Sequence, residues 1–204
     1  QGSTRYNLAK SNLLEGTFLL PPINEQRLIS AALMDVDEAI KSLERLITKK
    51  RDMKQAIMQQ LLTGRSRLPG FISEWQSISI GSFAVFLKGS GLSRSQIQPS
   101  GERLCVLYGE LFTTYGRVID EVKSRTNSQE GTISLIGDVL MPASTTTKGE
   151  DLATASALLE SGISLGGDVN IIRPNLDLID SRWLAYRLSN CHRNEIAGIA
   201  QGTT

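Results

Sequence analysis

The chain has 204 residues, of which 40% are hydrophobic and 21% are charged. These proportions exclude a disordered chain, and two cysteines are too few for a disulfide framework. No apolar run reaches the roughly 18 residues that a membrane span needs, and no signal peptide opens the chain. We therefore expect a cytoplasmic protein of one domain, with or without a long projecting element.

The charges are unevenly distributed, although the net charge is only +1. Residues 1–70 carry 11 Lys and Arg against 7 Asp and Glu, whereas residues 130–204 carry 5 against 9. The most basic stretch is 45–67. It fits either a phosphate-binding patch or cations that complement the dipole at a helix C-terminus, and charge alone leaves both interpretations open.

Residues 24–64 predict one long helix. Pro21 and Pro22 precede it, Asn24 is placed as its N-cap, and no Gly or Pro follows until Gly64. We expect Gly64 to end the helix. The predicted length is about 39 residues, or about 58 Å at 1.5 Å per residue.

A heptad pattern runs along this helix. Eight of its ten a and d positions are apolar; the other two are Lys50 and Lys54, where Leu46 and Met53 can continue the stripe. The pattern predicts pairing with a second long helix, and the alternative is a helix that lies across its own domain. The eight apolar positions, called the seam below, are Ile29, Leu33, Val36, Ile40, Leu43, Ile47, Ile57 and Leu61.

Residues 71–204 predict one globular domain of mixed α and β structure, so the expected fold class is α+β with a long projecting coiled-coil helix. Gly-, Ser- and Thr-rich loops separate its short apolar segments. The expected strands are 76–80, 83–88, 103–108, 132–136 and 168–173, and the expected helices are 151–161, 181–189 and 193–200.

The sequence has no complete catalytic motif. The single histidine, His192, and the cysteines Cys105 and Cys191 lack the spacing of a zinc site. Glu121 and Lys123 match half of a nuclease metal motif, which leaves a metal-dependent nuclease as an alternative. We predict a non-catalytic binding module with no cofactor and no metal.

Three polar loops carry groups that suit contact with duplex DNA. Residues 88–94 offer backbone amides, hydroxyls and two cations to phosphates, and residues 144–148 add further phosphate contacts. Residues 113–117 combine hydroxyls, a ring and a guanidinium, which are groups that read base edges. The alternative for each loop is a plain exposed turn. The predicted DNA contacts are Lys88, Ser90, Arg94, Thr113, Thr114, Tyr115, Arg117 and Lys148.

Several segments resemble the DNA sequence-specificity subunit of type I restriction–modification systems. LPPINEQ at 20–26 resembles the start of that family's spacer helix, and IAGIAQGTT at 196–204 resembles the segment that closes its recognition domain. YGEL at 108–111, LIGDVL at 135–140 and the segment 168–174 resemble core segments of that domain. QGST at Gln1 and QGTT at Gln201 mark a repeat with a period of about 200 residues.

The resemblance implies tandem repeats of a recognition domain and a spacer helix, in a subunit without catalytic activity. Each domain would read half of a split double-stranded DNA target, while modification subunits methylate adenine and a restriction subunit cleaves.

For this chain the resemblance implies that 1–23 end a preceding recognition domain, 24–64 form the spacer helix and 71–204 form the DNA target-recognition domain. The chain would be a fragment or a half-subunit. A second spacer helix would come from the missing half or from a second copy. The alternative is a coiled-coil assembly adaptor whose globular domain binds protein.

Overall fold

The computed structural model describes residues 10–200, so the tetrapeptides that begin at Gln1 and Gln201 lie outside the described residues. The chain divides into two compact units between Lys54 and Gln55. The first unit contains α1 (Lys10–Leu14) and most of α2 (Ile23–Leu62), and the last turns of α2 belong to the second unit.

The long helix predicted at 24–64 is confirmed as α2, a single helix of 40 residues. It begins at Ile23, so Asn24 lies within the first turn and the predicted N-cap is wrong. Its first turn is bonded back to the preceding prolines, because Gln26 donates its N–H to the carbonyl of Pro22 at 3.0 Å. Gly64 ends the helix as predicted: it has a φ of +74°, a conformation that glycine adopts without a steric penalty.

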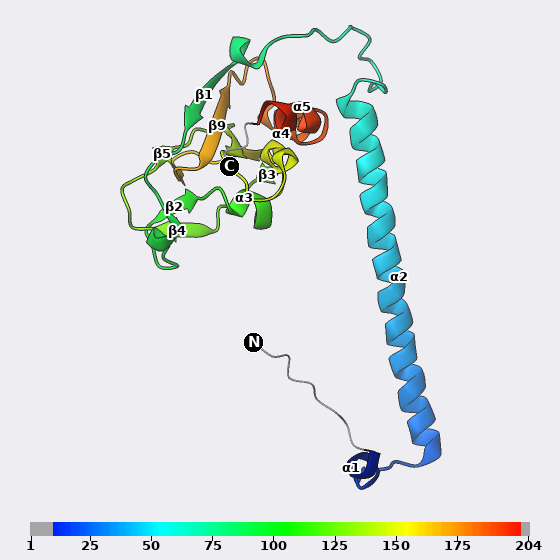
Figure 1. Ribbon diagram of the computed structural model, residues 1–204. Helices are drawn as coiled ribbons and strands as arrows, with labels where there is room; N and C mark the ends of the chain where they lie inside the picture. Colours follow the sequence, from blue (N-terminus) through cyan, green and yellow to red (C-terminus); the bar gives the residue numbers. More distant parts are fainter. Residues whose placement is uncertain (1–9, 201–204) are drawn as a thin grey trace. The chain divides into compact units, whose positions relative to one another are not determined.

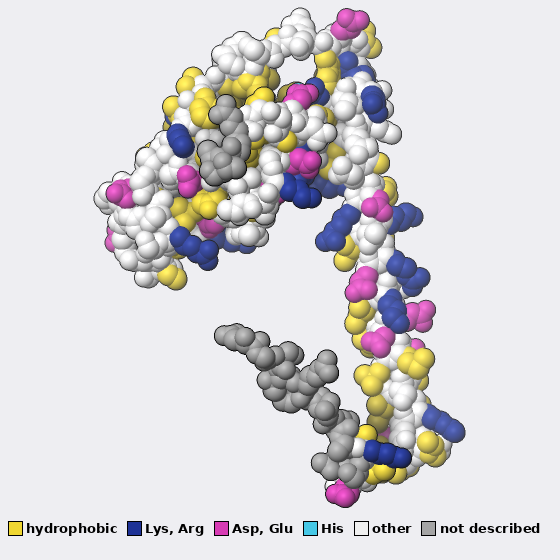
Figure 2. Space-filling model, viewed as in Figure 1, with side chains coloured by type: hydrophobic (Ala, Val, Ile, Leu, Met, Phe, Trp, Pro, Cys, Tyr) yellow, Lys and Arg dark blue, Asp and Glu magenta, His cyan; other side chains and the backbone are white. Residues whose placement is uncertain are grey.

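The seam of α2 is exposed along most of its length. In the first unit its residues from Ile29 to Ile47 each expose about half or more of their surface, starting from 48% for Ile29. In the second unit Ile57 is 50% exposed and Leu61 is half-buried. Figure 2 shows the apolar side chains lying between charged ones along the helix. Pairing with a second helix remains a prediction.

The second unit contains two β-sheets, which confirms the α+β class (Figure 1). The five-stranded sheet has the order β1 (Ala84–Lys88), β9 (Val169–Pro174), β6 (Val139–Pro142), β7 (Ser156–Leu158) and β3 (Val118–Ile119). The four-stranded sheet has the order β4 (Ser124–Thr126), β2 (Arg103–Val106), β8 (Ser164–Leu165) and β5 (Thr132–Ile133).

The helices of the second unit are short. They are α3 (Glu110–Thr113), α4 (Ser181–Asn190) and α5 (Arg193–Ile199), and single 3₁₀ turns form η1 (Ile80–Ser82), η2 (Arg94–Gln96) and η3 (Gly149–Ala153). The structure therefore confirms the helices predicted at 181–189 and 193–200.

The core has two layers, one on each face of the five-stranded sheet. Because successive strand residues point to opposite faces, Val139 and Met141 pack in the cluster that includes α4, whereas Leu140 packs toward the second sheet. On β9, Ile172 and Ile171 divide in the same way. The five-stranded sheet is thus buried between α4 and the four-stranded sheet.

Two predicted elements are wrong. Residues 76–80 form no strand; they have no pairing partner, and Ile78 is 56% exposed. Residues 151–161 form no helix, because they pass from η3 into β7. Their alanines favour a helix by intrinsic propensity, but Ala155 and Ala157 are fully buried beneath α4, where only small side chains fit. A strand overlaps each of the other four predicted ranges, and β9 extends one residue past its range, to Pro174.

Candidate nucleic-acid interface

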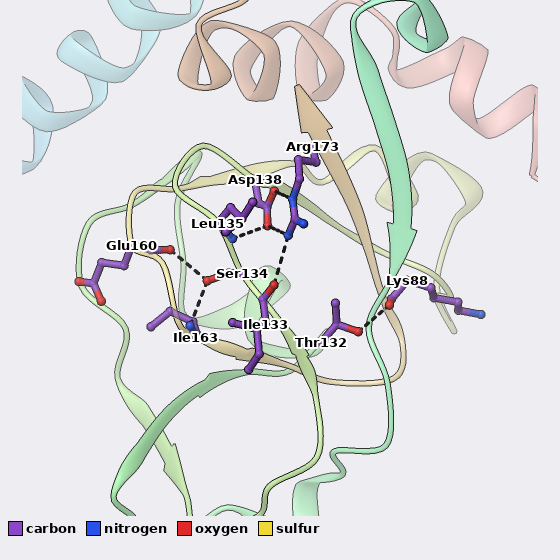
Figure 3. Close-up of polar contacts among 9 residues, drawn as sticks. All are labelled: Lys88, Thr132, Ile133, Ser134, Leu135, Asp138, Glu160, Ile163 and Arg173. Carbon is purple, nitrogen blue, oxygen red and sulfur yellow. Dashed lines mark hydrogen bonds and ion pairs between the residues drawn. The ribbon is translucent and has the colours of Figure 1, made fainter. Parts of the chain in front are cut away.

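Three of the predicted DNA contacts lie close together along the chain, in the second unit. Lys88 is the last residue of β1, Ser90 follows it in a loop, and Arg94 begins η2. All three are exposed. Figure 3 shows the side chain of Lys88 extending away from its hydrogen-bonded backbone carbonyl. The two cations are therefore accessible to a phosphate backbone, whereas the Ser90 hydroxyl accepts a hydrogen bond from Thr132 at 3.3 Å.

A second segment lies beside this loop and is hydrogen-bonded to it. The hydroxyl of Thr132 donates to the carbonyl of Lys88 at 2.8 Å, and that of Thr126 donates to the carbonyl of Gln96 at 2.7 Å. The Gln96 amide also donates to a carboxylate oxygen of Glu130 at 2.8 Å. Residues 88–98 and 126–132, called the paired loops below, therefore form one polar surface.

Further side chains that the sequence pattern did not single out lie on or beside the paired loops. Arg103 donates to Oε1 of Gln129 at 2.9 Å and to the carbonyl of Ser128 at 3.2 Å, which positions its guanidinium beside them. Asn127 donates from its amide to Oε1 of Gln98 at 2.9 Å. Arginine, asparagine and glutamine form the bidentate contacts that identify bases in the major groove. Such residues are concentrated at 96–103 and 125–129, and this pattern in the sequence could have indicated the site.

The glycine-rich part of the first loop packs inside the protein. A Cβ atom on Gly89 would lie 1.8 Å from the carbonyl oxygen of Gly166, so only glycine fits. The N–H groups of Gly89 and Ser90 donate to Val169 and Leu165 at 2.8 and 3.2 Å. The prediction that these amides contact phosphate is therefore wrong, because the domain already uses them. Only the exposed side chains of this loop remain available for contact with DNA.

An ion pair between a buried carboxylate and a partly exposed arginine holds the segment that follows β5 (Figure 3). Asp138 is fully buried and accepts two hydrogen bonds from Arg173, each 2.8 Å long. The same carboxylate accepts the N–H of Leu135 at 2.9 Å, and Arg173 also donates to the carbonyl of Ile133 at 3.2 Å. The carboxylate raises the pKa of Arg173, mainly through these hydrogen bonds. The pair thus fixes the end of β5 next to the paired loops.

Ser134 fixes the same segment from the other side. Its hydroxyl donates to the carbonyl of Glu160 at 3.0 Å and accepts the N–H of Ile163 at 3.0 Å (Figure 3). Ser134 is fully buried, so these bonds satisfy a polar group that would otherwise be costly to bury.

The remaining predicted contacts lie elsewhere in the domain, and among the described residues no side-chain hydrogen bond or ion pair joins them to the paired loops. Thr113 and Thr114 are exposed at the end of α3. Tyr115 packs against the core, and its hydroxyl accepts the N–H of Lys123 at 3.1 Å. Burial raises the pKa of Tyr115. The position of the Tyr115 ring is therefore explained by packing within the domain, without a contact to DNA.

Arg117 and Lys148 lie in regions where cations and anions are mixed. Arg117 is half-buried, and this burial, followed by the nearby charge of Arg193, lowers its pKa. Lys148 is exposed at the start of η3. Arg193 is paired with Asp151 at 2.9 Å. The paired loops are therefore the better candidate interface.

The residues of the alternative nuclease reading, Glu121 and Lys123, are both exposed and lie between β3 and β4, on neither strand. Within residues 10–200 no three His, Cys, Asp or Glu side chains are grouped so that they could hold a metal ion. Burial, with a smaller contribution from the charge of Glu110, raises the pKa of the Cys105 thiol to about 11. Cys105 is therefore an unreactive core residue.

None of the helices in the described part of the chain has the length and apolar character needed to cross a membrane.

No protein-family model matches the sequence. A chain from a type I R-M system, in a structure that addresses complex assembly and conformational transition, matches 96% of this chain with a TM-score of 0.57 and 20% identity. The HsdS subunit from Thermoanaerobacter tengcongensis matches 98% of it with a TM-score of 0.51 and 20% identity.

The chain spans about half the length of these two proteins, 48% and 50% respectively. The match covers nearly all of this chain, including the long helix and the domain with two sheets. The protein therefore has the fold of type I HsdS specificity subunits, which is the fold that the sequence resemblance implied.

Proposed function

We propose that this chain is a sequence-specific DNA-binding module of a type I restriction–modification specificity subunit. It reads half of a bipartite double-stranded target and directs adenine methylation or cleavage by partner modification and restriction subunits. The chain itself is not catalytic. The observation that carries the proposal is the fold match over 96–98% of the chain, which covers both the long helix and the domain with two sheets.

The paired loops support DNA binding at the level of side chains. They present Lys88 and Arg94, and Arg103 of β2 lies beside them. The amides of Asn127 and Gln129 hydrogen-bond to Gln98 and Arg103, which holds them on the same surface. Cations position a protein on the phosphates, and amide or guanidinium groups read bases. Hydrogen bonds between the loops hold these groups in place before DNA arrives, which lowers the entropy lost on binding.

The exposed seam supports the second half of the proposal. Fully burying one Ile or Leu contributes about 1.5–3 kcal/mol, so a row of such side chains favours pairing with another long helix. We propose that this helix comes from the other half of the subunit or from a second copy. Residues 1–23 then end a preceding recognition domain, 24–64 are the spacer helix and 71–204 are the recognition domain.

Changing Ile40 and Leu43 to Asp tests the pairing. Sedimentation of the purified chain at increasing concentration should show self-association that the double variant loses. Changing the exposed Lys41 and Ser42 to Asp is the matched control, because they lie between the seam positions. If both chains remain monomeric and unassociated at every concentration, a second copy is not the partner.

Titration with duplex DNA at increasing salt tests the DNA-binding function. Binding through several phosphates should weaken steeply, with a slope of about 0.9 in log affinity per neutralised phosphate. A coiled-coil assembly adaptor would show no such dependence, and metal-dependent cleavage by the chain alone would support the nuclease alternative. Either result would contradict the proposal.

A further inference from the structure

The last turn of α2 lacks a cation of its own. The four C-terminal carbonyl groups of any helix have no partner within the helix, and cations nearby stabilise them. The last turn of α2 has no basic residue. A guanidinium from α4 takes that place, because Arg187 donates to the backbone carbonyl of Leu62, 125 residues earlier in the chain. Leu62 is the buried residue of α2.

The same guanidinium lies over two aromatic rings. It is 5.4 Å from the ring centre of Trp75 and 5.6 Å from that of Trp183, while Arg67 covers Trp75 at 5.3 Å. The two rings meet edge to face, with centroids 6.2 Å apart and an angle of 81° between their planes. Such contacts add attraction beyond the burial of apolar area.

The chain segment after α2 is shaped to fit this cluster. Gly64 turns the chain with a φ of +74°, and a Cβ atom there would lie 3.2 Å from the Trp75 ring. Arg67 also donates to the carbonyl of Ser73 at 2.8 Å, which folds residues 67–73 back beneath its side chain. All these residues belong to the second compact unit.

We propose that Arg67, Trp75, Trp183 and Arg187, the tryptophan joint, fasten the end of the spacer helix to the recognition domain and thereby set the separation of the two half-sites that the protein accepts. Arg187 is a positioning residue in this proposal, because it acts through the end of α2 and the two tryptophans. The inference rests on the proposed function. The first part of the inference, that the joint fastens the helix end to the domain, concerns this chain alone.

The chain provides its own probe of the joint, because Trp75 and Trp183 are its only tryptophans. Changing Arg187 to Met removes the donor and the cation but keeps an unbranched side chain. Arg182→Met is the control, since Arg182 lies on the same helix and pairs with Asp180. Arg187→Met should shift the tryptophan emission and speed amide exchange at residues 60–75 about tenfold, as expected when a local contact is lost. Arg182→Met should change neither.

Selection from a duplex library tests the second part of the inference, that the joint sets the separation of the half-sites. The library contains two half-sites at varied separation, and the complete protein with its second spacer helix is the binder. Arg187→Met should leave the half-site bases unchanged but bind several-fold better than the parent at separations that the parent rejects, and Arg187→Lys should restore part of the selectivity. Unchanged emission and exchange would overturn the joint, and an unchanged range of separations would overturn its role in spacing. Failure of the parent to select any DNA would overturn the proposed function and the spacing role, while emission and exchange would still decide whether the joint exists.

Discussion

Arg173 on β9 donates two hydrogen bonds, each 2.8 Å long, to the buried carboxylate of Asp138. Asp138 precedes β6, so the pair connects the turn after β5 to the centre of the five-stranded sheet. Thr132 lies on β5, just before this turn, and its hydroxyl donates to the carbonyl of Lys88. The core of the domain is therefore linked to the paired loops through a short chain of polar contacts.

Changing Asp138 to Ala should destabilise the domain strongly. The substitution leaves the partly exposed Arg173 guanidinium and the N–H of Leu135 without their acceptor, and an unsatisfied polar group of this kind costs about 1–3 kcal/mol. Urea unfolding measures the loss. Asp168→Ala is the control, because Asp168 is exposed, and it should change the free energy of unfolding by less than about 0.5 kcal/mol. Equal effects of the two substitutions would contradict the assigned role of the pair.

Changing Gly89 to Ala should also destabilise the domain, because the added methyl group would overlap the carbonyl oxygen of Gly166 at 1.8 Å. Gly81→Ala is a matched control, since no atom lies within 4 Å of its Cβ position. Thermal unfolding should show a clearly lower midpoint for Gly89→Ala and little change for Gly81→Ala. A normal midpoint for Gly89→Ala would mean that the loop is not packed against residues 165–167.

Asp180 should make stability depend on pH. It is the N-cap of α4, accepting the N–H groups of Arg182 and Trp183 at 2.8 and 3.0 Å. The hydrogen bonds from the Arg182 side chain, followed by those from the backbone, lower the pKa of Asp180 to about 2. The unfolded value is about 3.9, so the stabilisation is complete above pH 4 and is lost as the pH falls toward 2.

Asp180→Ala should therefore cost about 1 kcal/mol at pH 7, as is typical for the loss of an N-cap. The difference from the parent should shrink between about pH 4 and pH 2. Asp177→Ala, an exposed carboxylate three residues earlier, is the control. A difference that stays constant down to pH 2 would show that the carboxylate charge does not stabilise α4.

The two groups of predicted DNA contacts can be separated by substitution. Changing Lys88 and Arg94 together to Ala should weaken binding to all duplexes and reduce the salt slope by about 2, if each contacts one phosphate. Changing Arg117 and Lys148 together should have a smaller effect, because both lie away from the paired loops. Arg182→Ala is the control, and filter binding across a salt series measures each variant. A larger loss of binding for the Arg117 and Lys148 variant than for the Lys88 and Arg94 variant would place the interface at Arg117 and Lys148.

The sequence predicted α2 well because its signals are local: two prolines before it, a glycine after it and a heptad pattern between them. The strand β7 was predicted as a helix because alanine propensity is local, whereas the burial of Ala155 and Ala157 under α4 depends on tertiary packing. The candidate site was predicted in part for the same reason. Lys88 and Arg94 stood out as cations in a polar loop, but Arg103 joined them only through the pairing of β2 with β4.

Selection of bound sequences from a fully randomised duplex library tests the central claim most directly. The parent chain should enrich one short motif, or two half-sites at a fixed separation if it pairs with a second copy. Substituting Arg103 with Ala should relax the preference at one base position, at a cost of about 1–3 kcal/mol for a base-reading residue. Recovery of unenriched sequences, bound with an affinity that does not change with salt, would contradict the account.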